Sequence, residues 1–144
     1  MKNINELRRK VMIIGNRLHI KGLSLSEALK RAWEIIKSGI TTKVKGVTFG
    51  NAQKAIEHLT RYSPEDIIID LKRYSANLYD GNAIEVYAGV KNKGIVKIGF
   101  LPAPLTFIIS RCLDMNLKVN ALYSEIRGKY DSYMNYGIVI NLQL

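Results

Sequence analysis

A turn that runs directly into a strand, residues 77–89 (NLYDGNAIEVYAG), constrains the fold of this chain more than any other stretch. Over 84–87 apolar and polar side chains alternate, which is the period-two pattern of a strand. The residues before it favour turns or accept positive φ: Asn77, Asp80, Gly81 and Asn82. Polar and aromatic side chains at the mouth of a rigid strand are typical of a binding loop. The alternative is a turn whose Asn and Asp side chains bond their own backbone.

Six strand-like segments and two helical ones are expected after residue 40. Strands are expected at 41–50 and 66–74, in a β-hairpin over 82–101 that turns at 91–94, and at 117–128 and 136–144. Short helices are expected at 51–62 and 103–116, and a polar bend at 128–135. This order predicts an α+β chain whose strands form a small, partly closed, OB-like β-barrel.

Residues 1–40 are expected to form a basic helical hairpin that precedes the barrel domain of residues 41–144. Apolar side chains recur at three- and four-residue steps in both halves of this segment, as on one face of a helix. Ser24 stands three residues before Glu27, the spacing of a capping box, and marks the start of the second helix. Trp33 falls on the apolar stripe of that helix, so we expect it in the core rather than exposed as a stacking platform for bases.

Basic residues are concentrated at the front of the chain. The sequence has 22 Lys and Arg against 12 Asp and Glu, a net charge of +10. Residues 1–45 hold eleven basic and three acidic side chains, a net charge of +8. Residues 46–144 hold eleven basic and nine acidic side chains, a net charge of +2. A basic front of this kind suggests a phosphate-rich partner or an anionic surface. The alternative is that the charge serves solubility alone.

Length and composition indicate a soluble chain with one main domain. Its 144 residues suffice for a core, and 47% hydrophobic with 24% charged residues is ordinary for a globular protein. No apolar run is long enough to predict a membrane span, and no signal peptide follows Met1. The single cysteine, Cys112, has apolar neighbours and allows no internal disulfide, so we expect a buried side chain and a cytoplasmic location.

Few residues offer catalytic chemistry. His19 and His58 each lack a second His, Cys or carboxylate at metal-ligand spacing. The sequence contains no phosphate-binding glycine loop, nucleophile elbow or dinucleotide fingerprint, and its acidic residues show no pairing that implies acid–base work. We therefore expect no enzymatic activity, no catalytic residue, no metal and no cofactor.

Two short motifs point to a known family. The first comprises Arg73, Asn77, Tyr79, Asp80, Asn82, Ala83 and Ile84, with Leu78 in place of the usual proline. The second is the run GFLP at 99–102. Together they resemble the HIRAN domain, a module found at the front of some fork-remodelling helicase-like ATPases and alone in bacteria and phages. The resemblance covers about residues 44–126 and leaves the helical hairpin unexplained.

This resemblance implies a barrel that binds single-stranded DNA at a free 3′ end. It implies that a base stacks on Phe49 and that Tyr79 supplies a second ring or a hydroxyl contact, and such stacking is worth ~1–3 kcal/mol per base. Asp80 would accept a hydrogen bond from the terminal 3′-hydroxyl, whereas the phosphate of a continuing strand would be repelled. Phe100 would line the same groove, and Asn77 would bond a sugar, a base edge or the loop itself.

Other contact residues are expected from charge or position. Lys97 and Lys72 are expected to contact phosphates, on charge alone. Thr48 precedes Phe49 at a position where DNA-binding members carry an arginine, and the last strand lacks an aromatic residue that some of them use. The basic hairpin of residues 1–40 is expected to supply the missing phosphate contacts.

Three functions are compatible with these features. The expected one is a non-enzymatic module that binds single-stranded DNA, as a stand-alone accessory protein of a phage or mobile element. The second is a protein inhibitor from such an element, which binds a host nuclease, as an anti-CRISPR does, or a replication or repair factor. The third is a structural barrel that dimerises through the edge of its last strand. Dependence on a free DNA end and on salt would mark the first function, and dependence on a protein partner the second.

Overall fold

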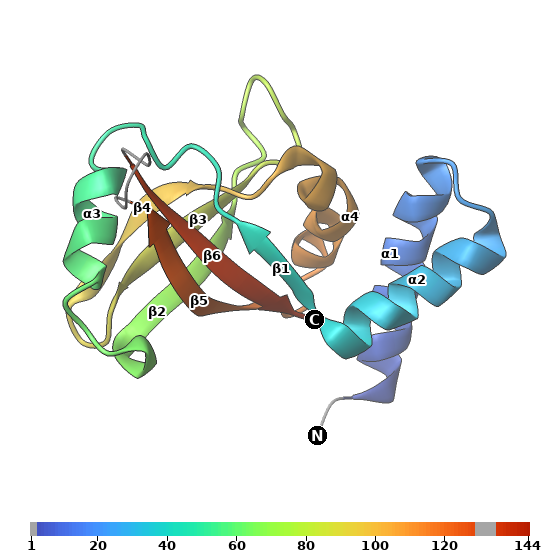
Figure 1. Cartoon of the computed structure of the whole chain (residues 1–144). Coiled ribbons are helices and arrows are strands. Elements are labelled where there is room, and N and C mark those ends of the chain that lie inside the picture. The colour runs from blue at the N-terminus through green and yellow to red at the C-terminus, as the bar shows by residue number, and fades with distance from the viewer. Residues whose placement is uncertain (1–2, 129–134) are drawn as a thin grey trace.

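The strands lie between a short helix on one side and a group of three helices on the other (Figure 1). The computed structural model describes residues 3–128 and 135–144. Its helices are α1 (Ile4–Ile20), α2 (Leu25–Ser38), α3 (Ala52–Leu59) and α4 (Ala103–Asp114), with a 3₁₀ turn at Pro64–Asp66. Its strands are β1 (Ile40–Lys43), β2 (Ile67–Arg73), β3 (Ile84–Val90), β4 (Gly94–Phe100), β5 (Asn120–Gly128) and β6 (Tyr136–Gln143).

The strands form two antiparallel sheets of three. One has the order β1–β6–β5 and the other the order β2–β3–β4. The sheets meet where Lys45 and Phe100 form an isolated bridge, with N–O distances of 2.7 and 2.8 Å, and where β2 packs beside β5. The α+β class is confirmed. A barrel is not confirmed, because no continuous ladder of hydrogen bonds joins the two sheets within the described residues.

The first expected strand, 41–50, is shorter than predicted. β1 ends at Lys43, and the chain then turns at Gly46 and Gly50, whose φ angles are 78° and 60°. Left-handed backbone of this kind suits glycine and interrupts an extended strand. The two glycines therefore stop the ladder after the single bridge at Lys45.

Most other elements lie within a few residues of their predicted bounds. The β3–β4 hairpin turns at 91–94, where Asn92 and Gly94 have φ angles of 66° and 87°. α4 follows Pro102, and Cys112 on its inner face is fully buried, as expected. The polar bend predicted at 128–135 falls almost wholly on residues 129–134, which lie outside the described part of the chain.

The N-terminal segment forms the predicted helical hairpin. Ser24 caps α2, since its Oγ accepts a hydrogen bond from the Glu27 N–H at 3.2 Å. The prediction for Trp33 is wrong, because this side chain is 37% exposed. The face of α2 that packs into the core is a narrow row of small or branched residues: Ala28, Ala32 and Ile36.

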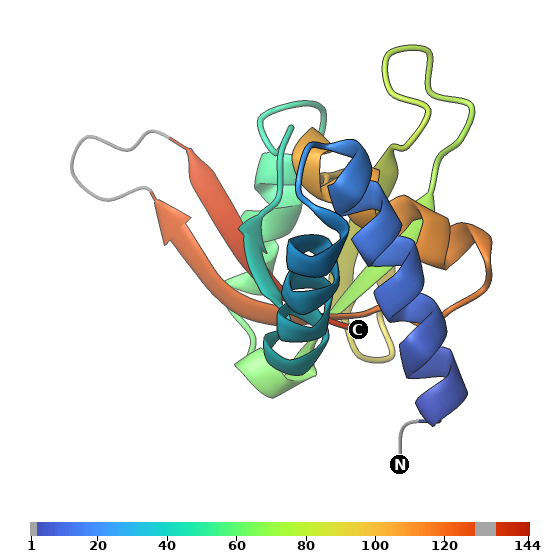
Figure 2. The same cartoon turned by 90° about the vertical axis from the view of Figure 1, so that its right-hand side faces the viewer.

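This hairpin is packed onto the body of the protein. Figure 2 faces the hairpin and shows α1 alongside α4. Arg17 on α1 holds the contact, since its Nε donates to the Phe107 carbonyl oxygen at 2.7 Å and its guanidinium lies 3.7 Å from the centre of the Phe107 ring. Ile14 and Ile36 belong to one continuous core with the strands. The hairpin is thus part of the structural core, whatever else it contacts.

Candidate nucleic-acid interface

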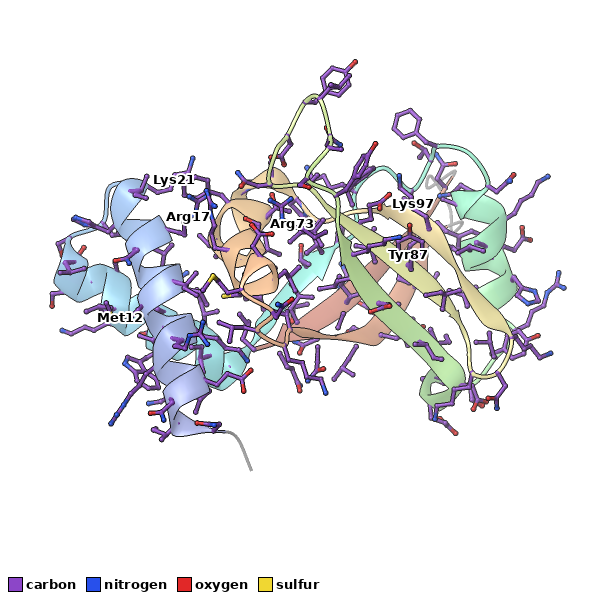
Figure 3. All side chains as sticks on the ribbon, turned by 180° about the vertical axis from the view of Figure 1, so that it is seen from behind. Met12, Arg17, Lys21, Arg73, Tyr87 and Lys97 are labelled. Carbon is purple, nitrogen blue, oxygen red and sulfur yellow. The ribbon has the colours of Figure 1, made fainter. Side chains whose placement is uncertain are left out.

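The loop between β2 and β3, residues 74–83, is held at its base by Arg73. The guanidinium donates to the carbonyl oxygens of Gly81 at 2.7 Å and Ala83 at 3.0 Å. It also pairs with Asp114 at the end of α4, with 2.9 Å between Nε and Oδ1. Figure 3 shows Arg73 at the foot of the loop, beside α4. The first residue of the motif therefore positions the loop, and its side chain is only 19% exposed.

The Asn and Asp side chains of the loop bond the loop itself. Asn77 Oδ1 accepts from the N–H groups of Tyr79 at 2.8 Å and Asp80 at 3.1 Å. Asp80 Oδ1 accepts from the Asn82 N–H at 2.8 Å, and its Oδ2 accepts from the Thr106 hydroxyl at 3.3 Å. These bonds close the turn. They leave the half-buried Asp80 carboxylate fixed in orientation, with one oxygen held only by a long bond.

The tip of this loop presents two large side chains to solvent. Leu78 is 94% exposed and Tyr79 is 99% exposed. Figure 1 shows the loop standing clear of the body, next to the start of α4. Because the bonds below it fix the turn, a partner that stacks on the Tyr79 ring would not have to order the loop backbone, and only the side chain would lose freedom.

Beside the loop, the outer face of the β2–β3–β4 sheet gathers charged and aromatic side chains. Strand pairing places Lys72, Glu85 and Phe100 in one cross-strand row. Tyr87 and Lys97 form the next pair along the same face. Paired residues point to the same side of a sheet. Three predicted contact residues, on β2 and β4, therefore share one surface.

Lys97 is the centre of this surface. Its Nζ lies 2.9 Å from Glu85 Oε2, 4.3 Å from the centre of the Phe100 ring and 5.9 Å from that of Tyr74. The Tyr87 hydroxyl donates to the other Glu85 oxygen at 3.4 Å, and Figure 3 shows Tyr87 beside Lys97. Glu85 thus holds the ammonium group next to the aromatic rings.

A pocket of about 420 Å³ opens at the edge of this surface, between β4 and the turn before α3. Phe49 and Phe100 both line it, together with Lys97. A Cβ on Gly46 would lie 3.8 Å from a ring carbon of Phe49 and 3.9 Å from one of Phe100, so the glycine sits between the two rings. Phe49 is 78% exposed, and the neighbouring Thr48 is exposed as well.

The predicted site residues therefore fall into two groups. Lys72, Lys97, Phe100 and Phe49 belong to the sheet surface and its pocket, with Thr48 next to Phe49 in the chain, whereas Asn77, Tyr79 and Asp80 belong to the loop. We call the surface formed by Phe49, Tyr74, Tyr87, Lys97 and Phe100 the aromatic face.

Three residues of this region were missed by sequence reasoning. Tyr74 and Tyr87 add rings to the aromatic face, and Glu85 fixes its lysine. The alternation over 84–87 already put Glu85 and Tyr87 on the face opposite the core. The alternation could not predict that Lys97 of β4 lies beside them, because a bulge after Val86 shifts the register between β3 and β4.

The described residues offer little for covalent or metal chemistry. Within 3–128 and 135–144, no three His, Cys, Asp or Glu side chains come close enough together to hold a metal ion. Burial raises the pKa of the Cys112 thiol to about 11, so the thiol stays protonated at neutral pH and is a poor nucleophile. The arrangement supports stacking, charge pairing and hydrogen bonding.

None of the four helices in the described part of the chain combines the length and the apolar character needed to cross a membrane.

Comparison with known proteins gives one distant likeness. No family model matches the chain, and no curated protein matches it. A crystal structure of a protein from Lactobacillus plantarum is similar, with 18% sequence identity over 72% of this chain and 92% of that chain, and a TM-score of 0.46. A likeness this weak assigns neither family nor function, so the function has to be argued from the site.

Proposed function

We propose that this chain is a non-enzymatic module that binds single-stranded DNA through the aromatic face and the tip of the 74–83 loop. The observation that carries the proposal is the exposed Phe49 ring, set beside Phe100 at a pocket that Lys97 also lines. Rings stack on any base, and a lysine among them can meet a phosphate. Surfaces that bind single-stranded nucleic acid commonly combine exposed aromatic rings with basic side chains.

The exposed aromatic and apolar side chains of this region are unusual for a surface that contacts only water. Tyr79 and Leu78 are almost fully exposed at a turn that several hydrogen bonds hold in place. Single apolar side chains on a surface need no explanation, whereas several gathered around one site mark a place of contact. The DNA-binding proposal gives these side chains a partner.

A preference for a 3′ end is part of the proposal, and it rests on Asp80. The carboxylate is held by the Asn82 N–H and the Thr106 hydroxyl, so it would meet a strand in a fixed orientation. A terminal 3′-hydroxyl can donate to it, whereas a 3′-phosphate would bring a second negative charge to the same place. The HIRAN resemblance implies the same preference.

We also propose that the two sheets together make the open, OB-like barrel of the HIRAN family. The Lys45–Phe100 bridge supports this on one side, and the packing of β2 beside β5 supports it on the other. The GFLP run would then have a structural purpose, because Gly99 lets the backbone of Lys45 approach β4 closely.

Fluorescence anisotropy with a short single-stranded DNA tests the proposed function. We expect binding to weaken when the free 3′-hydroxyl is replaced by a 3′-phosphate. We expect Phe49→Leu to weaken binding by about tenfold or more, the worth of one stacked base, and Phe49→Trp to preserve it because a ring remains. Equal binding by the wild type and Phe49→Leu would overturn the site, and no binding by the wild type would favour a protein partner.

A further inference from the structure

A second and larger hollow lies next to the Phe49–Phe100 pocket. It has a volume of about 640 Å³ and runs between α3 and the β3–β4 hairpin. We call it the α3–β4 groove. Lys54 and His58 line it from α3, and Lys93 and Lys97 line it from the hairpin. Both hollows are bordered by Asn51 and Lys97, so they form one path along β4.

The charged side chains that line this groove are all basic. Its lining residues include three lysines and a histidine and no Asp or Glu. Lys54 makes no salt bridge within the described residues, and Lys93 contacts only the neutral Tyr62, with its Nζ 3.3 Å from the hydroxyl oxygen. Two of the three ammonium groups are therefore not neutralised by a carboxylate, and the groove attracts anions.

Apolar side chains make up much of the groove surface. The apolar lining residues are Ile95 and Val96 on the strand, which are 41% and 53% exposed, and Ala55 and Leu59 on α3. A small anion would gain nothing from such walls. A nucleic-acid strand suits them, because its sugars and bases can cover apolar surface while its phosphates meet the lysines.

We infer that the α3–β4 groove holds the phosphate backbone of the strand that leaves the Phe49–Phe100 pocket. The protein then binds several nucleotides of a single strand along β4, and not only the last two nucleotides at its end. This inference rests on the proposed function, since it gives that site its length and its direction. Lys97 marks the junction of the two parts, and Lys54 and Lys93 contact phosphates further from the end.

Two oligonucleotide lengths test the groove with the full chain. The affinity of a thymidine tetranucleotide and of a decanucleotide is measured by anisotropy at several salt concentrations. The groove variant is Lys54→Gln with Lys93→Gln, and the matched control is Lys30→Gln with Lys37→Gln on α2, which removes the same charge from exposed positions. Thermal melting of each variant checks that its fold is retained.

The wild type should bind the decanucleotide more tightly than the tetranucleotide. The groove variant should lose that gain, a loss of about tenfold or more, while its tetranucleotide affinity stays the same. Its log–log salt slope for the decanucleotide should fall by about 1.4, or roughly 0.7 for each lost phosphate contact. The control variant should keep both the gain and the slope.

Three results would overturn the inference. In the first, the wild type gains nothing from the longer strand, in which case tetranucleotide binding still supports the proposed function. In the second, the groove and control variants weaken decanucleotide binding equally, so that only overall charge matters. In the third, the wild type binds neither strand, and the proposed function fails together with the groove.

Discussion

At the scale of single residues, Arg73 is the side chain on which the shape of the binding loop depends. It ties the loop carbonyls of Gly81 and Ala83 to Asp114 on α4. Lysine keeps the charge and cannot reproduce this fork of donors. Arg73→Lys should lower the free energy of unfolding by about 1–3 kcal/mol in a denaturant titration, since bonds to charged groups are lost from a largely shielded site. Arg9→Lys on the exposed face of α1 is the control, and an equal effect of the two changes would contradict this role.

Cys112 gives a prediction about pH. Its folded-state pKa is raised by burial to about 11, whereas an unfolded thiol has a pKa of about 8.5. The protonated Cys112 thiol therefore makes its full contribution to the free energy of unfolding below about pH 8.5. Above that pH the free energy of unfolding should fall by ~1.4 kcal/mol per pH unit, until the folded thiol also ionises near pH 11. Denaturant titrations of the wild type and Cys112→Ala over this range isolate the effect. Parallel pH profiles for the two proteins would contradict the raised pKa.

At the scale of elements, the junction between the two sheets depends on Gly99. A Cβ there would collide with the Lys45 carbonyl oxygen, which accepts the bridge hydrogen bond from Phe100. Gly99→Ala should therefore destabilise the protein by about 1–3 kcal/mol, as overpacking does, and should also weaken DNA binding because Phe100 shifts. Gly81→Ala is the control, since a Cβ at Gly81 has open space around it. A Gly99→Ala protein as stable as that control would show that the bridge is dispensable.

The same elements show what the sequence could and could not predict. The β3–β4 hairpin was predictable because alternation, a turn at Asn92 and Gly94, and core burial all agree there. The strand predicted at 41–50 is too long, because its β-branched residues favour a strand. The left-handed φ angles of the glycines that follow it can be seen only in the backbone. Trp33 lies on the apolar stripe of α2, but periodicity does not say how far the packing partner reaches.

At the scale of the whole molecule, the basic hairpin and the aromatic face lie apart. Figure 3 shows Arg17 and Lys21 on one side of α4 and Lys97 well to the other side. We therefore expect a short strand on the aromatic face to make no contact with residues 1–40, although Arg17 and Lys21 pack on Phe107, next to the Thr106 that bonds Asp80. Deleting residues 1–40 would also remove part of the core.

Charge removal on α1 tests this separation without loss of the core. Arg8→Gln with Arg9→Gln takes two charges from exposed positions. The salt slope for a tetranucleotide should stay the same in this variant, because we expect the strand to lie on the other side of α4. A slope reduced by about 1.4, two phosphate contacts, would show instead that the hairpin binds the DNA directly.

The site itself was predictable only in part. Phe49, Lys97 and Phe100 were singled out separately from a resemblance and from charge, and their meeting at one pocket comes from the bridge between the sheets. Asn77 was a candidate contact residue, yet its side chain closes the loop. Turn residues and binding residues are the same types, so a sequence cannot separate the two roles before the hydrogen bonds are known.

The most direct test of the proposed DNA-binding site is a map of where DNA contacts the protein. The ¹⁵N-labelled full chain is titrated with a tetranucleotide that has a free 3′-hydroxyl, and amide chemical shifts are followed by NMR. We expect the largest changes at 46–50, 78–80 and 97–100, while α1 and α2 stay unchanged. Changes centred on α1 and α2, or no saturable change at any amide, would contradict the proposed site.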